Sequence, residues 1–95
     1  MYARVVRFTG ADAEGIEANL AAISANPEPP EGVTATRFLF LTDKVSGIVV
    51  AISFHETEED MRAADAVLNE MSPDQPMGTR EAVDMTEVAL DLTPS

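Results

Sequence analysis

The chain contains one histidine, His55, at the end of a run of strand-like residues. Alternate residues of a strand share a face, so His55 shares a face with Ala51 and Ser53, opposite large residues such as Phe54. The two small side chains leave space on that face, as the floor of a ligand pocket requires. A histidine there could remove a proton from a phenolic or enolic group near neutral pH. The alternative is a structural histidine, bonded to Glu56 or to the acidic residues that follow.

Further polar residues on predicted strands could contact a ligand. An arginine inside a cavity can hold a carboxylate or enolate oxygen through its planar guanidinium group, and Tyr2 could donate a hydrogen bond to a substrate. The predicted catalytic residues are therefore His55, Tyr2 and Arg4. The predicted ligand pocket contains Ala51, Ser53, Arg37 and Met61. In an acidic protein, however, strand arginines can equally form surface ion pairs, which contribute little stability.

A metal site is not predicted. The acidic residues Glu56, Glu58, Glu59 and Asp60 lie close together in the sequence. Consecutive helix positions point in different directions, and no histidine spacing typical of a metal site is present. These acids are better explained as complementing the dipole of a helix N-terminus. Cysteine is absent, which excludes disulfides, thiolate metal sites and cysteine nucleophiles.

The charge balance disfavours two classes of partner. Six Lys and Arg residues stand against seventeen Asp and Glu residues, for a net charge of −11. A polyanion is repelled by phosphate backbones and by anionic lipid, so neither nucleic acid nor a membrane surface is an expected partner. No apolar run approaches the ~20 residues that a membrane-spanning helix needs. We therefore expect a cytoplasmic protein.

The hydrophobic pattern predicts one α+β domain over residues 1–95, with the element order β-α-β-β-α-β. The predicted strands are residues 2–8, 33–42, 48–54 and about 80–92. Apolar residues recur at helical spacing in two further segments. The first buried stripe is Ala13, Ile16, Leu20 and Ile23, and the second is Met61, Ala64, Leu68 and Met71. This order predicts a ferredoxin-like fold: a four-stranded antiparallel sheet with both helices on one face.

Two features of the strands suggest contacts beyond a monomer. The runs 38–41 and 48–52 are apolar on both faces, whereas one face of a solvated sheet should be polar. The second face therefore needs a cover, and the same face of another copy would supply it, giving a homodimer through the sheet. In the last strand, Val88 and Leu90 have the opposite parity to Val83. This change predicts a bulge or sharp twist near residues 86–87, which would let the strand leave one sheet and join another.

Three segments carry a family resemblance: residues 1–5, 40–47 and 52–64. In order and spacing along the whole chain, the sequence resembles the antibiotic biosynthesis monooxygenase-like (ABM) group of the dimeric α+β barrel proteins. The resemblance implies a dimer and a substrate cavity between sheet and helices. Similar proteins often carry Leu-Trp-Glu-Ser where this chain has Phe-His-Glu-Thr at residues 54–57, and the chain contains no Trp. Haem-degrading relatives use a helix-borne histidine, and residues 58–71 contain none.

Two functions from different classes remain open. The first is a small cofactor-independent monooxygenase acting on an apolar aromatic or polyketide-like molecule, with His55 as base and Tyr2 or Arg4 orienting an oxygen. The enolate of the substrate would react with dioxygen directly, so no cofactor is expected. The second is a non-catalytic dimeric module that binds a small ligand or has a structural role. The absence of Trp and the small number of polar residues on the strands favour the second.

Overall fold

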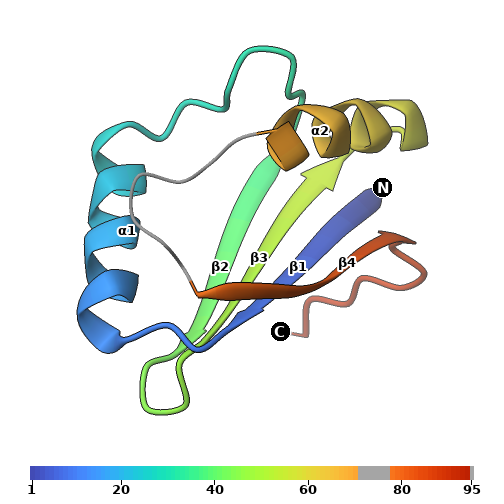
Figure 1. Cartoon of the computed structure of the whole chain (residues 1–95). Helices are drawn as coiled ribbons and strands as arrows, with labels where there is room; N and C mark the ends of the chain where they lie inside the picture. The colour runs from blue at the N-terminus through green and yellow to red at the C-terminus, as the bar shows by residue number, and fades with distance from the viewer. Residues whose placement is uncertain (71–77, 95) are drawn as a thin grey trace.

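The computed structural model describes residues 1–70 and 78–94. Its elements are β1 (Tyr2–Thr9), α1 (Ala13–Ala25), β2 (Arg37–Asp43), β3 (Ile48–His55), α2 (Glu58–Glu70) and β4 (Thr79–Glu87). The four strands form one antiparallel sheet in the order β2-β3-β1-β4, and the helices lie on one of its faces (Figure 1). The predicted α+β, ferredoxin-like fold is confirmed.

The pairing register decides which side chains face the helices. Arg4 pairs with Ser53 and Val6 with Ala51, while Ser53 pairs with Phe38 on the other side. Because directly paired residues lie on the same face of a sheet, these side chains share the helix-covered face. His55 is on the same face, as its parity predicted. The opposite face carries Val5, Leu39, Leu41, Val50, Ile52 and Phe54.

Local signals in the sequence set the ends of the helices and of the hairpin. Asp12 is the N-cap of α1, and its Oδ1 accepts a hydrogen bond from the Gly15 N–H at 2.6 Å. Thr57 Oγ1 likewise accepts from the Asp60 N–H at 3.1 Å at the start of α2. In the turn between β2 and β3, Gly47 adopts a φ of 71°, which glycine tolerates because it has no side chain. The Gly47 carbonyl accepts a hydrogen bond from the Ala11 N–H at 3.2 Å, which ties this turn to the start of α1.

The two helices pack differently on the sheet. The backbone of α2 lies close to β1, β3 and β4, and its Met61 and Ala64 are buried. The backbone of α1 approaches the sheet less closely (Figure 1). On α1 the buried residues are Ile16 and Asn19, whereas Leu20 and Ile23 are half-buried and Ala13 is exposed. The predicted stripes are therefore buried only in part, and Met71 lies outside the described residues.

The prediction for the last strand is wrong about where the strand ends and about a bulge near residues 86–87. The strand ends at Glu87 rather than near Leu92, and the Val88 N–H makes a final hydrogen bond to the Met1 carbonyl. Thr86 and Glu87 pair in regular register with β1, so no bulge lies there. The shifted parity of residues 88–92 arises because these residues have left the sheet. The observed irregularity is at the other end of β4, where Arg7 and Phe8 pair with Ala82 and Arg80 and skip Glu81.

Candidate functional site

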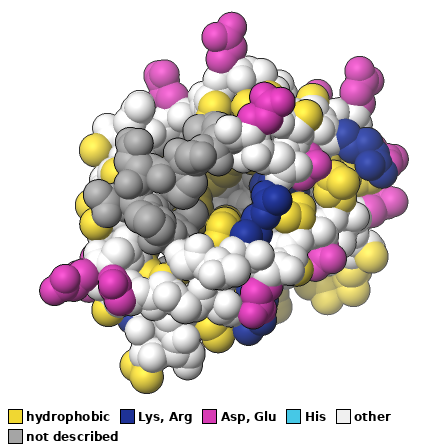
Figure 2. All heavy atoms as spheres, in the orientation of Figure 1, with side chains coloured by type: hydrophobic (Ala, Val, Ile, Leu, Met, Phe, Trp, Pro, Cys, Tyr) yellow, Lys and Arg dark blue, Asp and Glu magenta, His cyan; other side chains and the backbone are white. Residues whose placement is uncertain are grey.

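A cavity of about 1080 Å³ lies between the sheet and the helices. Figure 2 shows it as a hollow whose visible walls include hydrophobic and basic side chains. Its lining comes from α1, the loop that follows α1, α2 and all four strands. Its lining residues include Arg4, Phe8, Ile23, Phe38, Phe40, Ala51, Ser53, Leu68, Asn69 and Arg80. The cavity exists because α1 stands away from the strands that α2 covers closely.

The wall of the cavity is mainly apolar. Phe38 and Phe40 project from β2, and Phe8 projects from β1. Ile23 and Leu68 face them from the two helices. Aromatic rings offer large flat surfaces for contact with another ring system, so this wall suits an aromatic ligand. Small side chains on β3, such as Ala51, keep the floor of the cavity open.

Arg4 is the most buried charged group of the cavity. Its side chain is held by two residues of α2: Nε donates to Asp65 Oδ1 at 2.9 Å and Nη2 donates to Asn69 Oδ1 at 3.2 Å. Arg4 is only 6% exposed. A buried charge is tolerated when it is paired and hydrogen-bonded, and Asp65 supplies the opposite charge. Arg4 therefore joins the sheet to α2 and also contributes to the lining of the cavity.

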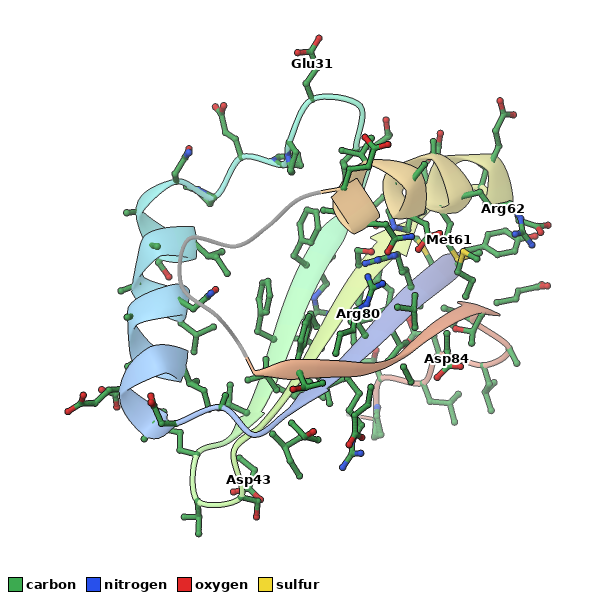
Figure 3. All side chains as sticks on the ribbon, in the orientation of Figure 1. Glu31, Asp43, Met61, Arg62, Arg80 and Asp84 are labelled. Atoms are coloured by element: carbon green, nitrogen blue, oxygen red, sulfur yellow. The ribbon has the colours of Figure 1, made fainter. Side chains whose placement is uncertain are left out.

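Arg80 is a second basic residue that lines the cavity, and it differs from Arg4 in exposure and in its partner. Its Nη1 donates to Asn69 Oδ1 at 2.6 Å, so one amide oxygen accepts from both guanidinium groups. Arg80 is exposed, and Figure 3 labels it in the space between the sheet and α2. Ion pairs hold Arg4, Arg7, Lys44 and Arg62, but Arg80 forms none with any residue that the structure describes.

A hydrogen-bonded chain runs from the cavity into the core. Ser53 lines the cavity, and its Oγ lies 2.8 Å from His55 Nε2. On the far side of the imidazole, Nδ1 lies 2.6 Å from the Thr34 carbonyl oxygen. A carbonyl can only accept, so Nδ1 carries a proton; in the neutral imidazole, Nε2 then accepts from the Ser53 hydroxyl. His55 is 0% exposed and does not itself line the cavity.

The structure brings some of the predicted site residues together and separates others. Arg4, Ala51 and Ser53 all line the cavity. Tyr2 and Met61 do not line it; Met61 is buried beneath α2. Arg37 lies on the opposite face of the sheet, where its guanidinium carbon is 5.9 Å from the centre of the Phe54 ring.

Sequence reasoning missed Asn69, Arg80 and Asn19. Asn69 and Arg80 come from elements distant in sequence, and only the fold places them beside Arg4. Asn19 offered a signal, because it is a polar residue next to the apolar stripe of α1 and proves to be buried. Arg80 offered a weaker one, as a basic residue at the start of the predicted last strand of an acidic chain.

The remaining electrostatic features lie away from the cavity. A hydrogen bond from Lys44, together with its charge, lowers the pKa of Glu17. Hydrogen bonds from Ser46, first that of its backbone N–H, lower the pKa of Asp43 in the hairpin turn. Within residues 1–70 and 78–94, no group of three or more acidic or histidine side chains could hold a metal ion. Over the same residues, no helix is long and apolar enough to span a bilayer.

No protein-family model matches this sequence, and no curated protein matches it closely enough to count as a relative. The functional interpretation therefore depends on the cavity and its residues.

Proposed function

We propose that this protein binds an apolar aromatic small molecule in the cavity beneath α1. The observation that carries the proposal is a large hollow whose wall is mainly apolar, with three phenylalanines on the sheet side. Pockets for small organic ligands are typically concave, mostly apolar and about 300–1,000 Å³ in volume. A ligand of two or three fused rings would cover Phe38 and Phe40, which face the cavity from the edge strand.

The test is a binding titration with a matched pair of variants. Naphthalene-based probes are titrated by fluorescence or calorimetry against wild type, Phe40→Ala and Leu41→Ala. Phe40 lines the cavity, whereas its neighbour Leu41 is on the opposite face and 47% exposed. Loss of ring contact should weaken binding about tenfold in Phe40→Ala and leave Leu41→Ala unchanged. Equal binding by both variants, or no binding by wild type, would contradict the proposal.

A second candidate function is cofactor-independent oxygenation of such a ligand, and the Ser53–His55–Thr34 chain favours it. Ser53 can take a proton from an acidic C–H or O–H of the substrate while passing its own to His55 Nε2. Arg4 would stabilise the resulting enolate. The overall reaction would convert a ring CH₂ group and O₂ into C=O and H₂O through a hydroperoxide. The same reaction is the one that the resemblance of residues 1–5, 40–47 and 52–64 to the ABM group implies.

If the protein is an oxygenase, Ser53 is the residue that contacts the substrate and accepts its proton. Oxygen uptake with an anthrone-type substrate should fall about 10²-fold or more in Ser53→Ala, as expected for loss of a general base pathway. His55→Ala should show the same loss. If His55→Ala fails to fold, the Ser53→Ala variant still tests the proton transfer. Equal rates in wild type and Ser53→Ala would show that the Ser53–His55–Thr34 chain takes no part in the reaction.

We further propose that the protein is a cytoplasmic homodimer paired through the uncovered face of the sheet. Large apolar side chains of β1, β2 and β3 face that side, and no described helix covers it. The absence of cysteine fits a reducing compartment. Sedimentation analysis should give a dimer for wild type and a monomer for Leu41→Asp. Val45→Asp, at a 99% exposed position of the hairpin turn, should remain dimeric. A monomeric wild type would exclude the dimer.

A further inference from the structure

Arg80 stands out among the basic residues because it lines the cavity and has no acidic partner within residues 1–70 and 78–94. The chain has seventeen acidic residues against six basic ones, so a carboxylate is the most available partner for any cation. Even so, the hydrogen bond of Arg80 goes to the neutral amide of Asn69. The charge of Arg4 is balanced by Asp65, and Glu28, which also lines the cavity, forms no ion pair with either arginine. Counting the ion pairs of the described residues, the two guanidinium groups therefore carry one excess positive charge.

We propose that this pair is an anion subsite, and that the ligand of the cavity carries one carboxylate group bound by Arg80. The inference rests on the proposed binding function and adds the chemical class of the ligand. The cluster of Arg4, Asn69 and Arg80 is defined here as the arginine subsite. It joins the apolar wall within one cavity, so a single molecule can contact both.

The geometry suits a carboxylate. A guanidinium group offers five N–H donors in a planar fork, which matches the two oxygens of a carboxylate. Asn69 occupies only one of the donors of Arg80 and orients the group from the side of α2. Asn69 in turn is positioned by its contact with Arg4, which Asp65 holds in place. The subsite is therefore built before the ligand arrives, which lowers the entropy that binding must overcome.

The charge of the subsite selects a monoanion. One excess positive charge balances a carboxylate, whereas a dianionic phosphate would leave net negative charge in a chain that already carries −11. The position of Arg80 sets the orientation of the ligand. Because Arg80 is exposed and Ile23 and Phe38 are half-buried, the carboxylate would lie toward solvent and the rings beneath α1.

The experiment compares naphthoate with naphthamide, which share the ring system and differ in charge. Both are titrated by calorimetry against wild type, Arg80→Gln, Arg80→Lys and Arg37→Gln. Arg37→Gln removes the same charge from the opposite face of the sheet and is the matched control. Circular dichroism of each variant checks that the fold is retained.

We expect wild type to bind naphthoate about tenfold more tightly than naphthamide, and Arg80→Gln to abolish this preference. Arg80→Lys should retain part of it, since the charge remains and the fork is lost. Arg37→Gln should retain all of it. If wild type binds both probes equally, or Arg80→Gln keeps the preference, the carboxylate subsite is wrong while the aromatic cavity stands. If neither probe binds, both proposals fail.

Discussion

Ile16 and Ile23 are the same residue type on the same helix, two turns apart, yet their environments differ. Ile16, in the first turns of α1, is 1% exposed. Ile23 is half-buried and lines the cavity. A seven-residue separation places both on one face of the helix, so the difference lies in what each meets. The beginning of α1 is packed into the core, and its end stands over a hollow.

The residues on the helix side of the sheet fall into two groups by their packing, called here the packed half and the hollow half, and β3 contributes residues to both. The packed half contains Ile16, Val49, His55 and the buried residues of α2; all three named residues are almost fully buried. The hollow half contains the phenylalanines and the arginine subsite. Stability should depend mainly on the packed half and ligand affinity on the hollow half. Substitutions in each half should therefore separate the two properties.

Replacing each isoleucine by alanine tests the comparison most directly. Ile16→Ala removes a fully buried side chain and should lower the free energy of unfolding by about 3 kcal/mol. Ile23→Ala should cost about 1 kcal/mol, because the side chain is already half exposed and alanine favours a helix. Urea unfolding followed by circular dichroism measures both. Equal losses would mean that α1 packs uniformly along its length.

His55→Ala should cost about 2 kcal/mol of stability, because it leaves the Ser53 hydroxyl and the Thr34 carbonyl without their partner in the core. Ser53→Ala removes one of these hydrogen bonds and should cost about 1 kcal/mol. The same unfolding assay applies. A His55→Ala variant as stable as wild type would show that the imidazole does not support the packed half.

Two substitutions that enlarge a side chain on the same face of β3 distinguish a filled position from an open one. Val49→Leu adds a methylene where the side chain is 0% exposed, and overpacking there should cost about 1–2 kcal/mol. Ala51→Leu should leave stability within about 1 kcal/mol, because the added atoms enter the cavity. Ala51→Leu should also weaken binding of an aromatic probe, which Val49→Leu should not. Destabilisation by both would indicate that the floor of the cavity is closed.

The smallest effect is expected outside both halves, at the hairpin turn. The pKa of Asp43 is lowered in the folded protein, so folding favours its charged form and gains stability above the usual aspartate pKa. That gain is lost as the pH falls through the lowered folded value. Asp43→Asn should therefore be slightly less stable than wild type near neutral pH and equally stable in strong acid. A pH-independent difference would assign the effect to something other than the charge.

The sequence predicted the fold more completely than the site. Alternation in β3 correctly placed Ala51, Ser53 and His55 on one face, and apolar residues at helical spacing correctly indicated the two helices. Periodicity could not show that α1 would leave a hollow, since Ile16 and Ile23 look equivalent in the pattern. His55 is buried behind Ser53 and is hydrogen-bonded to the Thr34 carbonyl. Because Thr34 is distant in the sequence, alternation within β3 could not predict this environment. Arg80 reaches Asn69 only through the register of β4.

The hydrogen bond between Ala11 and Gly47 has a dynamic consequence. It fastens the start of α1 to the β2–β3 turn, while the end of the helix lies over the cavity. Local opening of a helix is easiest where few buried contacts resist it. Amide hydrogen exchange along α1 should therefore be slowest near Ile16 and fastest toward Ala25. A ligand that fills the cavity would slow exchange at the far end and flatten this gradient.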